Sequence, residues 1–372
     1  MHCKMKVTQL YKFLFGLVAI SVLAVFFGRY LVEEETSQNT SNFKNIYSIN
    51  PTATFEPVLP NTKVSLPQDF AFHPDFQNEI WGYFSNLFDY SGNEYSVQWT
   101  YQRVSRDERD SNGWKNPQLY IAQIVIASKD KVWRQQRVAR GGIGQAGMLS
   151  RPFRLWIDNW NWRSISLSPV PGLLNVSADS FKVLLNSFAS SSYLAEGEGG
   201  YRQEHNFLPT ASYSFQMPLI NVAGELILDG KRIGVTGKAV LRKSWDSDIA
   251  IVQTQKQVEI NLHLDNGKSL FLKQNDIDGL PKYTSGMLAN IDGTKHNLID
   301  EDIVMTPSKF VLLDNGKLLP LQWTLRVAKY DINVTVQATN HEMWHPFIEP
   351  YWQGKVFSSE SKTSGYLKLS GY

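Results

Sequence analysis

The sequence predicts an all-β protein, and three observations support this. Short runs that alternate apolar and polar residues recur about every ten residues from Pro67 to the C-terminus, with turn residues between them. The chain is rich in strand-forming residues, and 13% of it is aromatic. Helical periodicity is scarce beyond the N-terminus. The one helix-like stretch there, residues 179–192, is equally compatible with a pair of strands.

The clearest single element is a β-hairpin in residues 224–248. Asp229-Gly230 is a two-residue turn signal between two alternating runs. The second strand is expected to carry Arg242 and Trp245 near its far end, followed by Asp246 and Asp248 in a pocket rim or a solvated loop. Further turns are expected at Ser91-Gly92-Asn93, Asp265-Asn266-Gly267, Ile291-Asp292-Gly293 and Asp314-Asn315-Gly316.

The N-terminus differs from the rest of the chain. Residues 1–32 contain lysines, an apolar run and then an acidic cluster, the order expected of a signal peptide or an uncleaved signal anchor. No small-residue cleavage site follows the apolar run, which favours a membrane anchor in the form of an apolar helix. Residues 33–66 are polar and proline-containing, as expected of a linker.

Composition excludes several functional classes. The net charge of +2 comes from interspersed signs, so no basic stripe for nucleic acid is expected. The single cysteine, Cys3, cannot form an intrachain disulfide. No nucleophile elbow, phosphate-binding loop or paired-cysteine motif is present, and no cofactor is expected.

An ordered set of motifs then connects most of the chain to one family. It resembles the lipocalin-like proteins that include carotenoid 1,2-hydratases and the AttH-type components of ABC transport systems. The resemblance implies two tandem lipocalin-like antiparallel β-barrels, over residues 67–218 and 219–372. The matching segments are residues 73–83 (HPDFQNEIWGY), 152–160 (PFRLWIDNW), 211–218 (ASYSFQMP), 222–230 (VAGELILDG), 236–245 (TGKAVLRKSW), 351–354 (YWQG) and 365–372 (GYLKLSGY).

The family pattern is altered where it would carry chemistry. Within residues 236–245 the two acidic positions of the family are occupied by Arg242 and Ser244. Hydration of an isolated alkene requires a carboxylic acid kept protonated in apolar surroundings, and a guanidinium cannot replace it. Asp246 and Asp248 are displaced from those positions. The sequence therefore disfavours enzymatic activity, and no catalytic residue is assigned.

Large aromatic and polar side chains within these motifs are the candidates for a ligand pocket. Trp156, Asp158 and Trp160 alternate along a short stretch, which suits either the lining of an apolar pocket or aromatic packing between strands. Gln123 stands where the family tends to have histidine. The full candidate set is Trp81, Tyr83, Gln123, Trp156, Asp158, Trp160, Tyr213, Arg242 and Trp245.

The segment His341-Glu-Met-Trp-His345 matches the zinc-protease pattern H-E-x-x-H. That chemistry requires a helix, but Pro346 follows at once and the preceding residues alternate like a strand. A metal site is therefore not expected.

Two functional hypotheses follow. The first is a membrane-anchored, periplasm-facing protein that binds an apolar ligand such as a lipid or isoprenoid and serves as the extracytoplasmic partner of an ABC transporter permease. The second is an enzyme that adds water to an isoprenoid alkene. The first requires only the fold, the anchor and an aromatic interior. The second requires an acid that the motif lacks.

Overall fold

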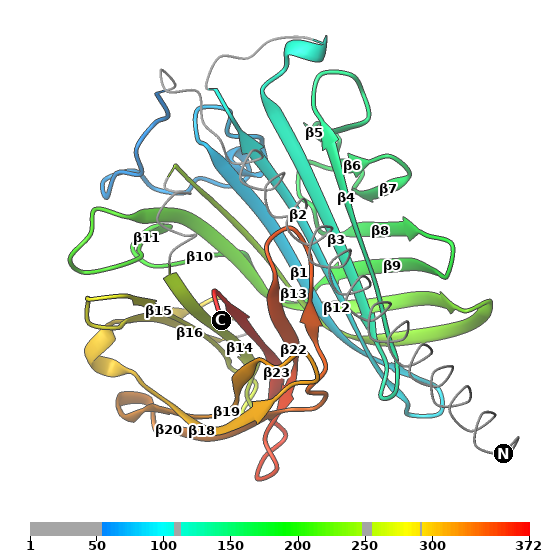
Figure 1. Cartoon of the computed structure of the whole chain (residues 1–372). Coiled ribbons are helices and arrows are strands. Elements are labelled where there is room, and N and C mark those ends of the chain that lie inside the picture. The colour runs from blue at the N-terminus through cyan, green and yellow to red at the C-terminus, as the bar shows by residue number, and fades with distance from the viewer. Residues whose placement is uncertain (1–53, 108–112, 248–254, 291) are drawn as a thin grey trace, which may run out of the picture. The chain divides into compact units, whose positions relative to one another are not determined.

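The computed structural model describes residues 54–107, 113–247, 255–290 and 292–372. These residues form two antiparallel β-sheets that curl into a near-barrel and a half-barrel (Figure 1), which confirms the all-β prediction. The short 3₁₀ helices are η1 (Gln68–Phe70), η2 (Gly113–Lys115), η3 (Asp300–Asp302) and η4 (Ala328–Tyr330).

The expected anchor, residues 1–32, and most of the linker lie outside the described residues. Within the part of the chain that the structure describes, no helix has the length and hydropathy of a membrane span.

The first sheet has 13 strands in the order β4-β3-β2-β1-β13-β12-β9-β8-β7-β6-β5, and β10 and β11 also pair with β12. Its strands are β1 (Asn78–Asp89), β2 (Glu94–Ser105), β3 (Gln118–Ala127), β4 (Val132–Arg140), β5 (Ala146–Ser150), β6 (Phe153–Ile157), β7 (Trp160–Arg163), β8 (Gly172–Ser177), β9 (Phe181–Ala189), β10 (Leu194–Ala195), β11 (Tyr201–Gln203), β12 (Ala211–Leu228) and β13 (Lys231–Asp246).

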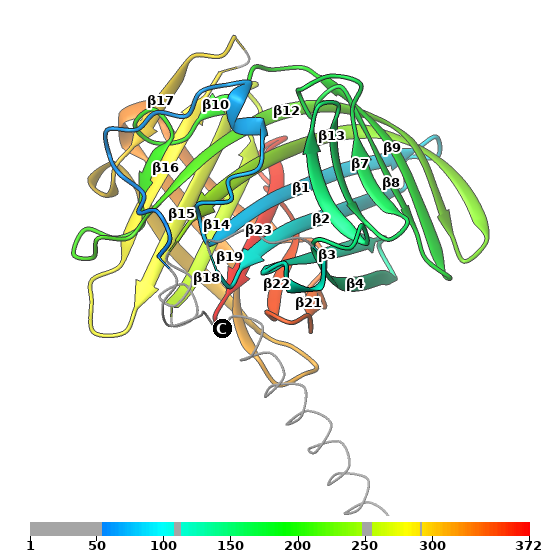
Figure 2. The same cartoon turned by 90° about the horizontal axis from the view of Figure 1, so that it is seen from above.

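The second sheet has 10 strands in the order β17-β16-β15-β14-β23-β22-β20-β19-β18, with β21 paired to β22 (Figure 2). Its strands are β14 (Gln255–His263), β15 (Ser269–Ile277), β16 (Tyr283–Ala289), β17 (Lys295–Leu298), β18 (Val304–Leu312), β19 (Leu318–Val327), β20 (Ile332–Ala338), β21 (Trp344–His345), β22 (Tyr351–Phe357) and β23 (Ser364–Ser370).

The predicted hairpin is present as β12 and β13. Leu228 pairs with Lys231, and the two residues between them, Asp229 and Gly230, have φ angles of 49° and 82°. Two consecutive left-handed residues are what a tight hairpin turn requires, and glycine adopts that conformation without steric cost. The prediction of this turn from its sequence is confirmed.

The structure decides between the two alternatives that the sequence left open for residues 179–192. This stretch contains strand β9, in which Phe181, Val183 and Leu185 point inward and the residues between them are exposed. The spacing of its apolar residues thus follows the two-residue period of a strand, because the neighbouring strands β8 and β12 pair with it.

The expected junction between the two halves, at residue 218, lies inside β12. Pro218 sits at a register irregularity between Met217 and Ile220, where a missing backbone donor is tolerated. The change from the first sheet to the second occurs later, between β13 and β14. The proline therefore marks a bulge within a long strand.

Each sheet encloses its own core. The first core is rich in aromatic rings, and the second is mainly aliphatic. Polar and apolar contacts both join the sheets. Gln98 donates to the carbonyl of Gln353, and Asn261 donates to the side chain of Gln216, both at 3.0 Å. Phe84 and Val240 of the first sheet pack against Tyr366 of the second.

Candidate ligand-binding cavity

A cavity of about 130 Å³ lies between the two sheets. The first sheet contributes residues of β1, β2, β11, β12 and β13, and the second contributes residues of β14, β15, β22 and β23. The lining includes the apolar side chains of Ile80, Phe84 and Val240. Most of the other lining residues are polar or charged, so the cavity presents both kinds of group.

Strand alternation determines which residues reach this cavity. On β13, Val240, Arg242 and Ser244 line it, whereas Lys243 and Trp245 point to the opposite face and are buried. Of the pocket candidates from the sequence, Arg242 and Tyr83 line the cavity. The Tyr83 ring also packs in the aromatic core, with its centroid 4.9 Å from that of Trp162.

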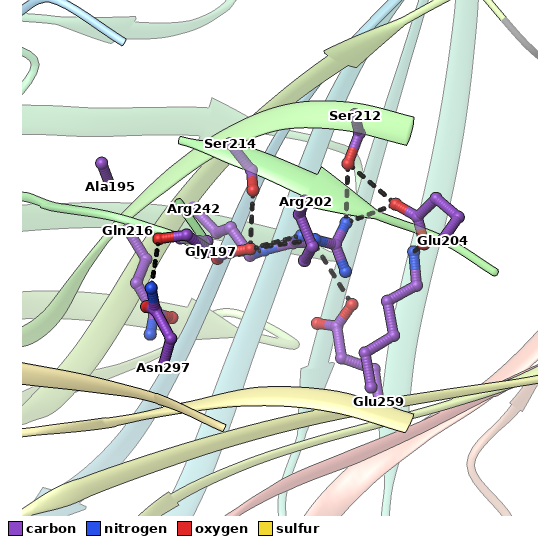
Figure 3. A network of polar contacts seen from close by, with 12 residues as sticks. Ala195, Gly197, Arg202, Glu204, Ser212, Ser214, Gln216, Arg242, Glu259 and Asn297 are labelled. Atoms are coloured by element: carbon purple, nitrogen blue, oxygen red, sulfur yellow. Dashed lines mark hydrogen bonds and ion pairs between the residues drawn. The ribbon is translucent and has the colours of Figure 1, made fainter. Parts of the chain in front are cut away.

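Arg242 is held by carboxylates from both sheets (Figure 3). Its Nε and Nη2 donate to the two carboxylate oxygens of Glu196 at 2.6 and 2.9 Å, and Nη1 donates to Glu259 at 3.3 Å. Tyr366 donates to the other oxygen of Glu259 at 2.5 Å. Burial opposes the charge on the guanidinium, but Glu196 and Glu259 outweigh it and raise the pKa of Arg242 above its ordinary value.

A second ion cluster adjoins the first. Arg202 Nη2 donates to Glu204 at 2.7 Å and to Ser212 at 2.9 Å, and Lys273 Nζ lies 2.9 Å from the other oxygen of Glu204. Burial and the neighbouring Arg202 lower the pKa of Lys273 to about 8. The Nη1 of Arg202 is buried and has no hydrogen-bond acceptor among the described residues.

The carboxylates of these clusters remain ionised. Burial alone would raise the pKa of Glu196, Glu204 and Glu259, but the adjacent cations hold each pKa below its ordinary value. None of the three can therefore be the protonated acid that hydration of an alkene requires.

Four of the aromatic candidates belong to the core of the first sheet. Trp81, Trp160, Tyr213 and Trp245 are all buried. The Trp81 ring packs edge-on against Phe153, and the indole nitrogen of Trp160 donates to a backbone carbonyl. These rings pack in the core, which for Trp160 is the alternative that the sequence left open.

The remaining candidates lie away from the cavity lining. Asp158 occupies the turn between β6 and β7 with a φ of 50° and lies 3.4 Å from Arg137. Trp156 donates to the carbonyl of Gly144. Gln123 accepts a hydrogen bond from Tyr351, at 3.2 Å, across the contact between the sheets. The structure thus divides the predicted set among the cavity, the core and the surface.

A further buried cluster lies on the other face of β13. Lys243 Nζ is 2.7 Å from Glu79 and donates to the backbone carbonyls of Asp69 and Ala71. His73 stacks on Trp245 with ring centroids 4.1 Å apart. Residues 69–79, which overlap the opening motif of the family resemblance at residues 73–83, are therefore attached to the first sheet by this cluster.

The H-E-x-x-H segment is not helical. Only Trp344–His345 forms a regular element, the short strand β21, and His341 and Glu342 are exposed. His345 is fully buried and donates to the carbonyl of Gln353 at 3.1 Å. No cluster of three potential metal ligands occurs in residues 54–107, 113–247, 255–290 or 292–372.

Most of the charged cavity residues were missed from the sequence. Glu196, Arg202, Glu204, Glu259 and Lys273 belong to no recognisable motif. Tyr366 could have been selected from the sequence, because it lies in the closing motif of residues 365–372. Nothing in that motif, however, indicates a carboxylate partner.

Comparisons with known proteins agree with this architecture. A family model described as AttH-like matches residues 57–372. The structure of a putative AttH from Nitrosomonas europaea is similar with a TM-score of 0.76 and 21% identity, covering 86% of this chain and 99% of its own. Kievitone hydratase from Nectria haematococca is similar with a TM-score of 0.63 and 12% identity, covering 87% of this chain and 98% of its own.

A comparison with curated protein sequences gave no match. At these identities, the two solved structures establish a shared fold. The family match extends over nearly all of the described residues and confirms the resemblance seen in the sequence motifs, so this chain belongs to the AttH-like family.

Proposed function

We propose that this protein binds a small amphipathic molecule in the cavity between its sheets and does not chemically convert it. The observation that carries the proposal is the mixed lining of the cavity, which includes the apolar side chains of Ile80, Phe84 and Val240 and the charged side chains of Arg202 and Lys273. An apolar ligand was expected from the sequence. The charged part of the wall instead favours a ligand with an apolar body and one polar end.

Arg202 and Lys273 define the polar end, because both cations line the cavity. A ligand oxygen there would accept a hydrogen bond from one of them. A carboxylate or carbonyl group suits the position, because a guanidinium only donates hydrogen bonds. The cavity volume of about 130 Å³ is below the roughly 300–1,000 Å³ of drug-sized pockets, which supports a small ligand or the end of a longer one.

Glycine 82 provides the sharpest test. It lines the cavity, and a Cβ atom added there meets no atom within 4 Å. We expect Gly82→Leu to fill the cavity and abolish binding of octanoate, which has an apolar chain and a carboxylate, while the melting temperature changes by less than about 2 °C. Calorimetric titration measures the binding, and mass spectrometry identifies molecules that co-purify with the unchanged protein.

The matched control is Gly234→Leu on β13, an exposed position outside the cavity lining, which should bind octanoate as the unchanged protein does. Equal binding by the Gly82→Leu variant and the unchanged protein would place the ligand site elsewhere.

The second candidate function is hydration of an alkene, and the similarity of the fold to kievitone hydratase is the observation that favours it. The ionised state of Glu196, Glu204 and Glu259 argues against it. We expect no addition of water to an acyclic carotenoid by the unchanged protein. Measurable hydration that is lost on Asp246→Asn would establish the enzymatic alternative.

The cellular setting is proposed from the sequence alone. Residues 1–32 would anchor the protein in the inner membrane with its body in the periplasm, next to an ABC transporter permease. Removal of residues 1–35 should then release the protein from the membrane fraction. Full-length protein found soluble with a trimmed N-terminus would identify the segment as a cleaved signal, and crosslinking in intact cells would test the permease.

A further inference from the structure

The outward surface of strands β5 to β9, which we term the β5–β9 face, is built differently from the cavity. On β6, Phe153 and Leu155 point into the aromatic core, and Arg154 between them points outward. The same alternation places Arg163 of β7 on the outward side. This face is a continuous sheet surface that covers the core from outside.

Two arginines lie directly opposite each other on this face. Arg154 pairs with Arg163 across β6 and β7, and neither forms an ion pair with a carboxylate among the described residues. Like charges in directly opposed positions destabilise a sheet. Strands β5 to β9 contain no acidic residue, so no neighbour on these strands compensates the repulsion.

The charge on this face is positive. Residues 146–189, which span β5 to β9, contain four lysine or arginine residues and two aspartates, Asp158 and Asp179. Asp158 lies 3.4 Å from Arg137. The field at the face is therefore positive, and it favours an anionic partner.

Apolar side chains flank the arginines. Ile165 is 99% exposed and Phe188 is 52% exposed, and both line a groove of about 800 Å³ together with Arg154 and Arg163. Leu149, which pairs with Arg154 from β5, is also exposed. A soluble anion would leave these apolar groups in water.

We propose that the β5–β9 face docks onto an anionic phospholipid membrane, with Arg154 and Arg163 contacting phosphate groups and Ile165 and Phe188 entering the headgroup region. A membrane surface presents both chemistries at once, because it carries negative charge next to acyl chains. This docking uses neither the cavity nor residues 1–32, so it is independent of the proposed ligand.

The test places a reporter on this face of the full-length chain. Cys3→Ser removes the single cysteine, and Asn186→Cys, a groove position, carries an environment-sensitive fluorophore. We expect a blue shift with phosphatidylglycerol vesicles and none with phosphatidylcholine vesicles. Arg154→Gln with Arg163→Gln should weaken the apparent affinity about 30-fold, and added salt should act in the same direction.

Two controls separate docking from attachment through the N-terminus. The fluorophore at Leu318→Cys, an exposed position on β19, should show no shift. Lys309→Gln with Arg326→Gln removes the same charge from exposed sites of the second sheet and should leave the affinity unchanged. Equal shifts with both lipids, no shift with either, or displacement of vesicles by poly-aspartate would overturn the proposal, the last in favour of an acidic protein partner.

Discussion

Arg242 and Lys243 are adjacent in the sequence, yet their side chains lie on opposite faces of β13. Arg242 faces the cavity and joins Glu196 of the first sheet to Glu259 of the second. Lys243 faces the aromatic core and joins Glu79 to the backbone at residues 69 and 71. The comparison shows that one strand can line the cavity with one face and, with the other, hold residues 69–79 against the sheet.

The two clusters also differ in their contact with solvent. The Lys243 and Glu79 side chains are 0% and 2% exposed, whereas those of Arg242 and Glu259 are 13% and 12% exposed. Because removing one member of a pair leaves the other charge buried, the drier cluster should tolerate such a change less well. Four predictions test this comparison.

The largest effect is expected at Lys243. Lys243→Met leaves the Glu79 carboxylate without its closest cation and should lower the free energy of unfolding by about 3–5 kcal/mol, measured by urea denaturation. Adding Glu79→Leu to the same variant should recover only part of the loss, because the buried Arg103 and the His73 backbone N–H also contact this carboxylate. A loss below about 1 kcal/mol in the single variant would show that the cluster is not a stability element.

Arg242→Met should cost less, about 2–3 kcal/mol, because water in the cavity can solvate Glu259 and Arg202 remains next to the buried Glu196. Without the cation the pKa of both carboxyls should rise above the unfolded value, so the variant loses stability as the pH increases through those values. Unfolding at pH 5 and pH 7 measures this difference. Arg242→Lys keeps the positive charge, so its stability should not show that pH dependence. If the Arg242→Lys variant shows the same pH dependence, the charge of residue 242 does not set the pKa of these carboxyls.

His345 extends the comparison to a buried base without a charged partner. Burial lowers its pKa from 6.5 to about 3. Its contribution to stability is therefore complete above pH 6.5 and is lost as the pH falls toward 3, because the unfolded chain binds the proton first. We expect about 2 kcal/mol less stability at pH 5 than at pH 7 from this residue.

His345→Gln should flatten the thermal stability profile between these two pH values, whereas the exposed His341→Gln should leave it unchanged. An unchanged slope in the His345 variant would assign the acid sensitivity to other groups.

The smallest effect is expected at Ser244, which faces the cavity on the same side as Arg242 and makes no ion pair. Ser244→Ala should change the free energy of unfolding by less than about 0.5 kcal/mol. If octanoate binding weakens in this variant while the stability is retained, Ser244 contacts the ligand. If the stability falls by more than about 1 kcal/mol, the cavity face of β13 is a structural element like the Lys243 face.

The sequence by itself determined the strand content, the Asp229-Gly230 turn and the family. These features are local, because a two-residue period and a left-handed glycine can be recognised within a few positions. The ordered motifs from residue 73 to residue 372 indicated the family. The sequence also correctly disfavoured a helical H-E-x-x-H segment, since Pro346 follows it directly.

The tertiary structure alone decided which side chains meet in the cavity. Glu196, Arg202 and Glu259 are all distant from Arg242 in the sequence. Glu196 and Arg202 come near it because β10 and β11 pair with β12, the neighbour of β13. Glu259 comes near it because β14 of the second sheet faces β13 there. The aromatic candidates were assigned to a pocket because large rings suit either a ligand or a core. The pairing and curvature of the strands determine which face of the sheet encloses the core. Trp81, Trp160 and Trp245 lie on that face and pack in the core.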